Sequence, residues 1–243
     1  MASTVQLSPI HPQTLGFFDV TAGFAKEKPH TVAKAVAVTM GWLKELDLVP
    51  EENKETASQI QYHASLVKLA RAPGNILQSI NGMYKSGSDL LSKRSWKEGC
   101  EVIKESTSLF NSVWDGVDFL SRAILFLPRK APAFVTGSGC NGIALAAGNL
   151  VKIPLHIAKI YNSKIYSAKK DSAEYNAAHK DVISRMISIA SAVTYVAIGA
   201  LVVLNVFFAF VFSPYIWLSL SVATIALSFT SYFQKNLGKE VGD

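Results

Sequence analysis

The pattern of apolar and polar positions divides the chain into helical segments that lead up to a long uncharged stretch. Residues 186–234 contain no Asp, Glu, Lys or Arg over 49 residues. A helix of about 18 apolar residues can cross a hydrocarbon core, so this stretch can cross it twice. Ser213-Pro214 divides it, because proline cannot donate a helical hydrogen bond and disfavours helix at the residue before it. The pattern predicts a transmembrane helical hairpin with limbs at 186–212 and 215–233.

Ahead of the hairpin, residues 30–151 show apolar positions at helical spacing. The spacing predicts one helix from Thr31 to Pro50, and a second from Glu51 that breaks at Pro73-Gly74. A weaker helical segment with two internal glycines follows. No strand-like alternation is long enough to predict a sheet. The predicted fold class is therefore all-α: an amphipathic helical bundle followed by a C-terminal two-helix transmembrane hairpin.

The strongest amphipathic pattern runs from Ser95 to Pro128. Ser95 and Glu98 fit the capping box that begins a helix. A heptad-like apolar stripe follows, at Trp96, Ile103, Phe110, Trp114, Val117 and Ile124. Such a stripe requires a partner surface. The partner is either the rest of the same bundle, another copy of the chain in a coiled coil, or a different protein, and we expect contacts of this kind through the 95–127 helix.

Residues 131–151 are uncharged and contain four glycines, which predicts a helix that packs closely against its neighbours. The sequence leaves open whether this segment touches the bilayer. Gly137 to Gly142 matches the dinucleotide-binding pattern G-x-G-x-x-G. No acidic residue follows at the expected distance of about 20 residues, and no second strand follows, so we expect no cofactor.

A basic segment with three tyrosines covers residues 152–185. Its cations are Lys152, Lys159, Lys164, Lys169, Lys170, Lys180 and Arg185. A lysine near an anionic membrane surface gains about 1 kcal/mol, and tyrosine favours the headgroup boundary. The segment predicts a juxtamembrane helix that contacts lipid headgroups, with a solvated basic helix face as the alternative. Nucleic acid is not an expected partner, because no base-reading module accompanies the charge.

The flanking charges predict the orientation of the hairpin. Lysines precede its first limb, Lys235 and Lys239 follow its second limb, and the turn is uncharged. The positive-inside rule then places both termini in the cytosol, with 235–243 as a short polar tail. Residues 1–29 show no helical period and contain no apolar core of signal-peptide length, so we expect a flexible segment and no cleaved secretory signal.

The sequence predicts no catalytic chemistry. Its two cysteines and five histidines lack metal-ligand spacing. Cys140 and His156 have no third group to orient them as a nucleophile and base, and no pair of carboxylates is set up for acid–base work. We therefore expect a non-enzymatic protein without metal, cofactor or small-molecule substrate.

The paired apolar limbs, 186–212 and 215–233, follow a Ser/Thr/Pro-rich start without a signal peptide. This arrangement resembles the type III-secreted inclusion membrane proteins of chlamydiae, whose mark is a bilobed hydrophobic segment. The resemblance implies insertion into a host vacuole membrane with both ends in the host cytosol. It also implies binding of other proteins through helical or coiled-coil regions.

Two alternatives remain open. Amphipathic residues 106–128 and the C-terminal limbs look like the corresponding parts of peroxisome-elongating peroxins of the peroxin-eleven type, which implies membrane remodelling. A pore-forming helical bundle that conceals an apolar hairpin is the second alternative. Neither family supplies catalytic residues to transfer.

Overall fold

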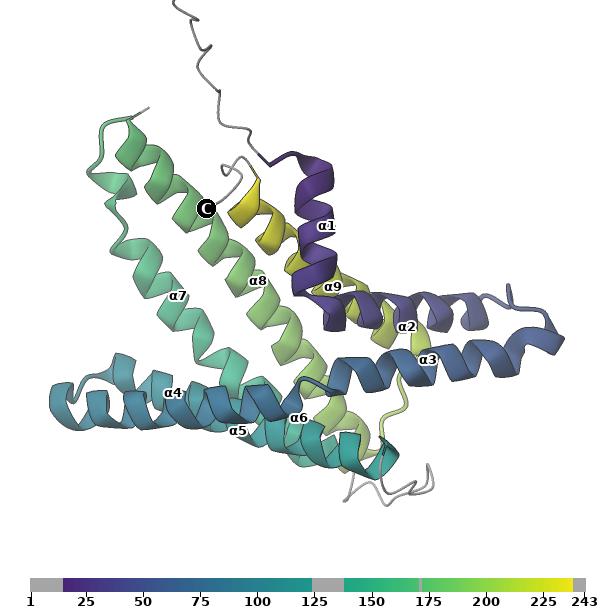
Figure 1. Ribbon diagram of the computed structural model, residues 1–243. Helices are drawn as coiled ribbons and strands as arrows, with labels where there is room; N and C mark the ends of the chain where they lie inside the picture. The colour runs from purple at the N-terminus through teal and green to yellow at the C-terminus, as the bar shows by residue number, and fades with distance from the viewer. Residues whose placement is uncertain (1–14, 124–137, 171, 238–243) are drawn as a thin grey trace, which may run out of the picture.

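The computed structural model describes residues 15–123, 138–170 and 172–237. Every regular element in these ranges is helical, which confirms the all-α prediction. Two long helices, α8 (Ala173–Phe208) and α9 (Pro214–Asn236), form the C-terminal hairpin (Figure 1). At about 1.5 Å per residue, the 36 residues of α8 extend about 54 Å, well beyond the thickness of a hydrocarbon core.

The connection between α8 and α9 follows the predicted chemistry. Ala209 adopts a left-handed conformation (φ 54°) and ends α8. The Ser213 hydroxyl accepts a hydrogen bond from the Tyr215 N–H, and Pro214 occupies the first turn of α9, where a missing N–H costs nothing. The Asn205 amide donates to the Phe210 carbonyl at 2.8 Å and helps to close the end of its own helix.

The segment at 152–185 was predicted as one helix, and this is wrong. The chain forms α7 (Lys152–Tyr161), a short 3-10 helix η2 (Lys164–Tyr166), and then the first turns of α8. The new helix begins because Ser172 caps it, its hydroxyl accepting from the Tyr175 N–H at 3.1 Å. The basic segment therefore turns back on itself, and α8 enters the apolar stretch without a break.

The N-terminal segment is also more ordered than predicted. Helix α1 (Phe17–Glu27) lies within the stretch 1–29 that we expected to be flexible; residues 1–14 lie outside the described part of the chain. Val20 and Phe24 are buried against Tyr232 near the end of α9. Helix α1 has a weak period of its own, so this contact with α9 is what stabilises it.

Helices α2 (Pro29–Glu45) and α3 (Lys54–Leu69, preceded by a 3-10 turn η1 at Glu51–Asn53) form the next pair. Helix α2 packs along α9: the Lys34 ammonium donates to the Thr224 hydroxyl, and the Tyr215 hydroxyl donates to the Glu45 carbonyl at 3.1 Å. The hairpin is therefore in contact with the bundle along the first half of α9.

Helices α4 (Ala72–Lys93) and α5 (Trp96–Ala123) form an antiparallel pair that lies across the hairpin (Figure 1). The break predicted at Pro73-Gly74 is present a few residues earlier: α3 ends at Leu69, α4 begins at Ala72, and Pro73 sits in the first turn of α4, where proline is tolerated. Ser95 donates to the Glu98 carboxylate at the start of α5. Ile124 lies outside the described residues.

Helix α6 (Ser138–Leu150) packs against α8 by close backbone contact, as its small residues predicted. A Cβ at Gly142 would lie 2.7 Å from Val202, and one at Gly199 would lie 2.6 Å from the Gly142 carbonyl. Residues Gly139–Tyr166, which cover α6, α7 and η2, are long and apolar enough to cross a membrane, as are α8 and α9. The described chain thus has three candidate spans where the sequence predicted two.

Candidate functional site

Apolar side chains point outward on the hairpin, and hydroxyl-bearing side chains point inward along the half that ends at Lys235. Outward residues on α8 and α9 include Val193, which is 51% exposed, and Val222, which is 46% exposed. On the inner face, hydroxyl-bearing residues repeat at helical spacing. They are Ser188, Ser191 and Tyr195 on α8, and Thr224, Ser228 and Ser231 on α9. This arrangement is the reverse of a water-soluble bundle and is what a lipid solvent favours.

These hydroxyls line a cavity of about 610 Å³ between α8, α9, the start of α7 and the junction of α1 with α2. We name it the inner cavity. Three lysines and a histidine also line it: Lys28, Lys152, His156 and Lys235. Glu27 is its one acidic lining residue among the described residues, and the Tyr232 hydroxyl is hydrogen-bonded to that carboxylate. The inner cavity is therefore polar and cationic.

Two cavity residues have specific surroundings. The Lys152 ammonium donates to the Asn149 amide oxygen at 3.0 Å, and Asn149 is buried and donates in turn to the Leu145 carbonyl at 2.8 Å. The Nδ1 atom of His156 is buried and has no hydrogen-bond partner within the described ranges. The hydrogen bonds of Lys152 and Asn149 are to neutral groups, and the Nδ1 atom of His156 has no partner in the described residues. These cavity side chains therefore have no direct hydrogen bond to a negatively charged group.

A second cavity, of about 350 Å³, adjoins the first and shares Tyr195, Thr224 and Ser228 with it. His30, Lys34, Arg71 and Asp115 are the charged or titratable residues of its wall. Burial, followed by the charges of Arg71 and Lys28, lowers the pKa of His30 to about 4. His30 is therefore neutral at physiological pH, and the second cavity is less strongly cationic than its composition implies.

The seven cations predicted to contact lipid headgroups fall into three groups: those paired with a carboxylate, those that are exposed, and one that lines the inner cavity. Three have acidic partners: Lys159 lies 3.9 Å from Glu101, Lys164 lies 2.9 Å from Glu174, and Arg185 lies 2.7 Å from Asp181. Lys169, Lys170 and Lys180 are exposed near the turn between α7 and α8. Lys152 alone of the seven lines the inner cavity. The structure thus brings Lys152 together with distant Lys28 and Lys235 and separates it from its sequence neighbours.

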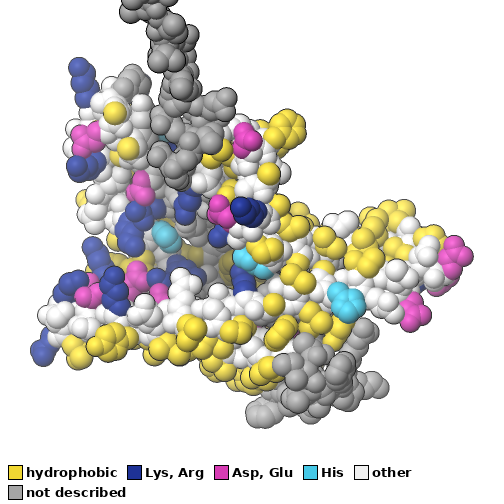
Figure 2. Space-filling view, viewed as in Figure 1, with side chains coloured by type: hydrophobic (Ala, Val, Ile, Leu, Met, Phe, Trp, Pro, Cys, Tyr) yellow, Lys and Arg dark blue, Asp and Glu magenta, His cyan; other side chains and the backbone are white. Residues whose placement is uncertain are grey.

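The stripe on α5 lies partly in the open. Trp96 is 55% exposed and Ile103 is 47% exposed, whereas Trp114 is half-buried. Exposed apolar residues of α4 continue the same surface, which we name the α4–α5 apolar face. Its members are Leu77, Ile80, Tyr84, Leu91, Trp96, Ile103, Phe110, Val113, Val117 and Leu120. Figure 2 shows hydrophobic side chains gathered along the edge of the molecule where α4 and α5 lie. The bundle covers the stripe only in part.

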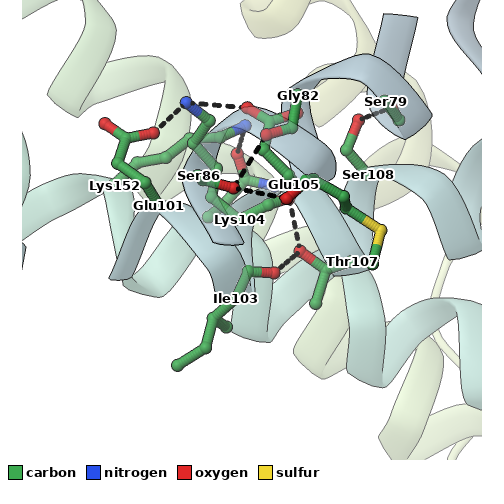
Figure 3. A network of polar contacts seen from close by, with 12 residues as sticks. Ser79, Gly82, Ser86, Glu101, Ile103, Lys104, Glu105, Thr107, Ser108 and Lys152 are labelled. Atoms are coloured by element: carbon green, nitrogen blue, oxygen red, sulfur yellow. Dashed lines mark hydrogen bonds and ion pairs between the residues drawn. The ribbon is translucent and has the colours of Figure 1, made fainter. Parts of the chain in front are cut away.

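The contact between α4 and α5 is polar. The Ser79 and Ser108 hydroxyls are hydrogen-bonded at 2.9 Å, and the buried Ser86 hydroxyl donates to the Gly82 carbonyl at 2.8 Å (Figure 3). Lys104 is paired with Glu101 and with Glu105. Burial opposes the charge of Lys104, but the hydrogen bonds to these two carboxylates raise its pKa. With polar groups inside and apolar groups outside, the pair resembles the hairpin in its arrangement.

Sequence reasoning missed the inner cavity, although the signal was present in the sequence. Spacings of three and four residues place Ser221, Thr224, Ser228 and Ser231 on one stripe of α9, and Ser188, Ser191 and Tyr195 on one stripe of α8. Gly139 and Gly142 of the dinucleotide-like motif lie at the start of α6 and pack against α8, and Gly137 lies outside the described residues.

No three His, Cys, Asp or Glu residues of the described chain are grouped so that they could hold a metal ion. Comparison of the chain with protein-family models, with curated proteins and with solved structures finds no match.

Proposed function

We propose that this chain is an integral membrane protein with a non-enzymatic interaction or scaffold role, anchored by the α8–α9 hairpin with both termini in the cytosol. The observation that carries the proposal is the distribution of side chains on the hairpin: its outward residues are apolar and exposed, and its hydroxyl-bearing residues line a cavity on the inner face of the half that ends at Lys235. A helical hairpin whose outward side chains are apolar along both helices is stable in lipid and not in water.

The position of α1 supports the proposed topology. The Phe17 ring lies 5.2 Å from the ring of Phe233, and Phe24 packs on Tyr232, so α1 contacts the C-terminal end of α9. The two ends of the described chain therefore meet at the end of the hairpin that carries Lys235, away from the Ser213-Pro214 turn. A shared position at the basic end fits two spans with both termini on one side.

Carbonate extraction of the full-length protein from expressing cells tests the membrane assignment. We expect the protein to remain in the membrane pellet. Lysines placed outward on the hairpin, Val193→Lys with Val222→Lys, should move it to the supernatant, because each costs about 3 kcal/mol at the centre of a span. Glu55→Lys on exposed α3 is the control and should change nothing. Release of the unaltered protein by carbonate would contradict the proposal.

The α4–α5 apolar face is the surface that we propose for protein partners or self-association. Cross-linking of the full-length protein in its native membrane should give a defined adduct, which Ile103→Ser with Phe110→Ser should abolish. A few residues near the centre of an interface carry most of its binding energy, at about 2 kcal/mol or more each, and Ile103 and Phe110 are our candidates for such residues. Unchanged cross-linking of the double variant would exclude this face as the interface.

Membrane remodelling is the second candidate, and the same apolar face favours it, since an amphipathic surface can enter one leaflet. Purified protein added to vesicles should then form tubules, and the same double variant should not.

Localisation in a host vacuole membrane is supported by the resemblance of the paired apolar segment to inclusion membrane proteins. Immunofluorescence of an infected cell tests that localisation directly.

A further inference from the structure

The inner cavity brings together positively charged side chains from three distant parts of the chain. Lys28 comes from the junction of α1 and α2, Lys152 and His156 come from α7, and Lys235 comes from the end of α9. Residues separated by about 200 positions in the chain therefore place positive charge around one volume of about 610 Å³. Glu27 is the single carboxylate within reach among the described lining residues, and its hydrogen bond with Tyr232 occupies it in part.

The contacts of the cavity side chains indicate which kind of ligand they favour. Lys152 is half-buried, and its direct hydrogen bond is to a neutral amide oxygen, while the Glu101 and Glu105 carboxylates act on its charge electrostatically. The buried Nδ1 atom of His156 has no partner in the described chain. Hydroxyls of Ser228 and Ser231 offer further donors on the α9 wall, whereas the Ser188 hydroxyl donates to the Ser184 carbonyl. Desolvated cations beside neutral donors favour an anion with several acceptor oxygens.

We propose that the inner cavity binds a phosphate group, that of an anionic phospholipid headgroup. Lysine ammonium groups bind phosphate as point charges, and three of them with several hydroxyls match the oxygens of a phosphate monoester. The cavity lies where α9 ends in Lys235 and Asn236, at the basic end of the hairpin. Headgroups of the cytosolic leaflet lie at this depth if the proposed membrane topology holds, and the choice of a lipid source rests on that topology.

Native mass spectrometry of the full-length protein in detergent micelles tests the site. The probes are short-chain phosphatidic acid, short-chain phosphatidylcholine and inorganic phosphate. We expect one bound phosphatidic acid and weaker binding of phosphatidylcholine, whose choline cation opposes the lysines. Lys152→Gln with Lys235→Gln should weaken phosphatidic acid binding roughly 30-fold, since each lysine near an anionic lipid contributes about fivefold. Lys169→Gln with Lys170→Gln removes the same charge outside the cavity and should leave binding unchanged.

The helical circular dichroism signal of each variant shows whether the variant folds. Lys235 is exposed, so Lys235→Gln alone should weaken phosphatidic acid binding about fivefold and leave the circular dichroism signal unchanged. Inorganic phosphate that displaces phosphatidic acid at equal affinity would assign the site to a soluble phosphate compound. Equal losses in both double variants, or equal binding of phosphatidylcholine, would overturn the site. Carbonate extraction tests the membrane assignment separately. If the protein resists carbonate extraction but does not bind phosphatidic acid, the proposed phosphate site is wrong and the membrane assignment stands.

Discussion

At the scale of single residues, the closest backbone approach in the hairpin region depends on glycine. A Cβ at Gly199 would lie 2.6 Å from the Gly142 carbonyl oxygen and 2.8 Å from the Ala146 nitrogen, and backbone atoms cannot move aside as a flexible side chain can. We expect Gly199→Ala to destabilise the α6–α8 contact by about 1–3 kcal/mol, because overpacking separates the two helices.

The thermal unfolding midpoint of the protein in detergent micelles measures this effect. Gly87→Ala is the matched control, because nothing lies within 4 Å of the added carbon, and it should leave the midpoint unchanged or raise it slightly. An unchanged midpoint in the Gly199 variant would show that α6 does not pack on α8 as described.

A second residue, His30, gives the protein a pH-dependent stability. Burial, and then the nearby Arg71 and Lys28 charges, lowers the pKa of His30 to about 4 in the folded chain, whereas an unfolded histidine titrates near 6.5. Between these values the unfolded state binds a proton that the folded state does not, so stability falls as the pH decreases through that window.

We expect the wild-type protein to lose about 1 kcal/mol more than His30→Asn between pH 7 and pH 5, a figure reduced because the ring is only half-buried. Unfolding midpoints measured across this range provide the check. The exposed His63 is the control position, and His63→Asn should keep the wild-type pH profile. Parallel profiles for His30→Asn and the wild type would disprove the assignment.

At the scale of elements, contacts between helices distant in the sequence decide which segments are ordered. Helix α1 depends on Phe24, whose ring lies 5.2 Å from Phe229 and 5.4 Å from Tyr232. Truncation of a buried phenylalanine typically costs about 3 kcal/mol, which is enough to detach a helix of 11 residues. We therefore expect Phe24→Ala to release α1 from α9.

Trypsin cleavage after Lys26 reports the release, and we expect it to be roughly tenfold faster or more in the Phe24→Ala variant. Phe18 lies on the same helix and is 85% exposed, so Phe18→Ala should be cleaved at the wild-type rate. Equal cleavage of the two variants would mean that α1 is not held by this aromatic contact.

At the scale of the whole molecule, α1 and the end of α9 lie together, which fits a chain whose two ends share one side of the membrane. We expect Phe18→Cys and Leu237→Cys, each in a background with Cys100→Ser and Cys140→Ser, to react with a membrane-impermeant maleimide from the cytosolic side. Val211→Cys, near the hairpin turn, should react only from the opposite side.

This experiment also decides the role of the third candidate span. If Gly139–Tyr166 crosses the bilayer as α8 and α9 do, the native Cys140 and Tyr161→Cys, which lie near the two ends of that stretch, will be labelled from opposite sides. Labelling from one side supports two crossings, with α6 packed beside α8 as an inner helix.

The helical fold and the hairpin were predictable from the sequence, because they depend on local properties. An uncharged stretch of 49 residues and one Ser-Pro pair suffice for two apolar helices and their turn. The close packing of α6 followed in the same way from its glycines. By contrast, the single helix expected at 152–185 was wrong, and the break expected at Pro73-Gly74 falls a few residues earlier, because helix ends depend on caps and on neighbouring helices as much as on proline and charge.

The sequence by itself determined that the chain has helices long and apolar enough to span a membrane, since hydrophobicity and length add up along the chain without reference to its path. Tertiary structure alone decided which polar residues share a site. Lys28, Lys152 and Lys235 stand far apart in the chain and meet only because α1, α7 and α9 converge on one cavity. It likewise decided that α1 is a helix, because a short segment gains order only when a distant surface buries its apolar face.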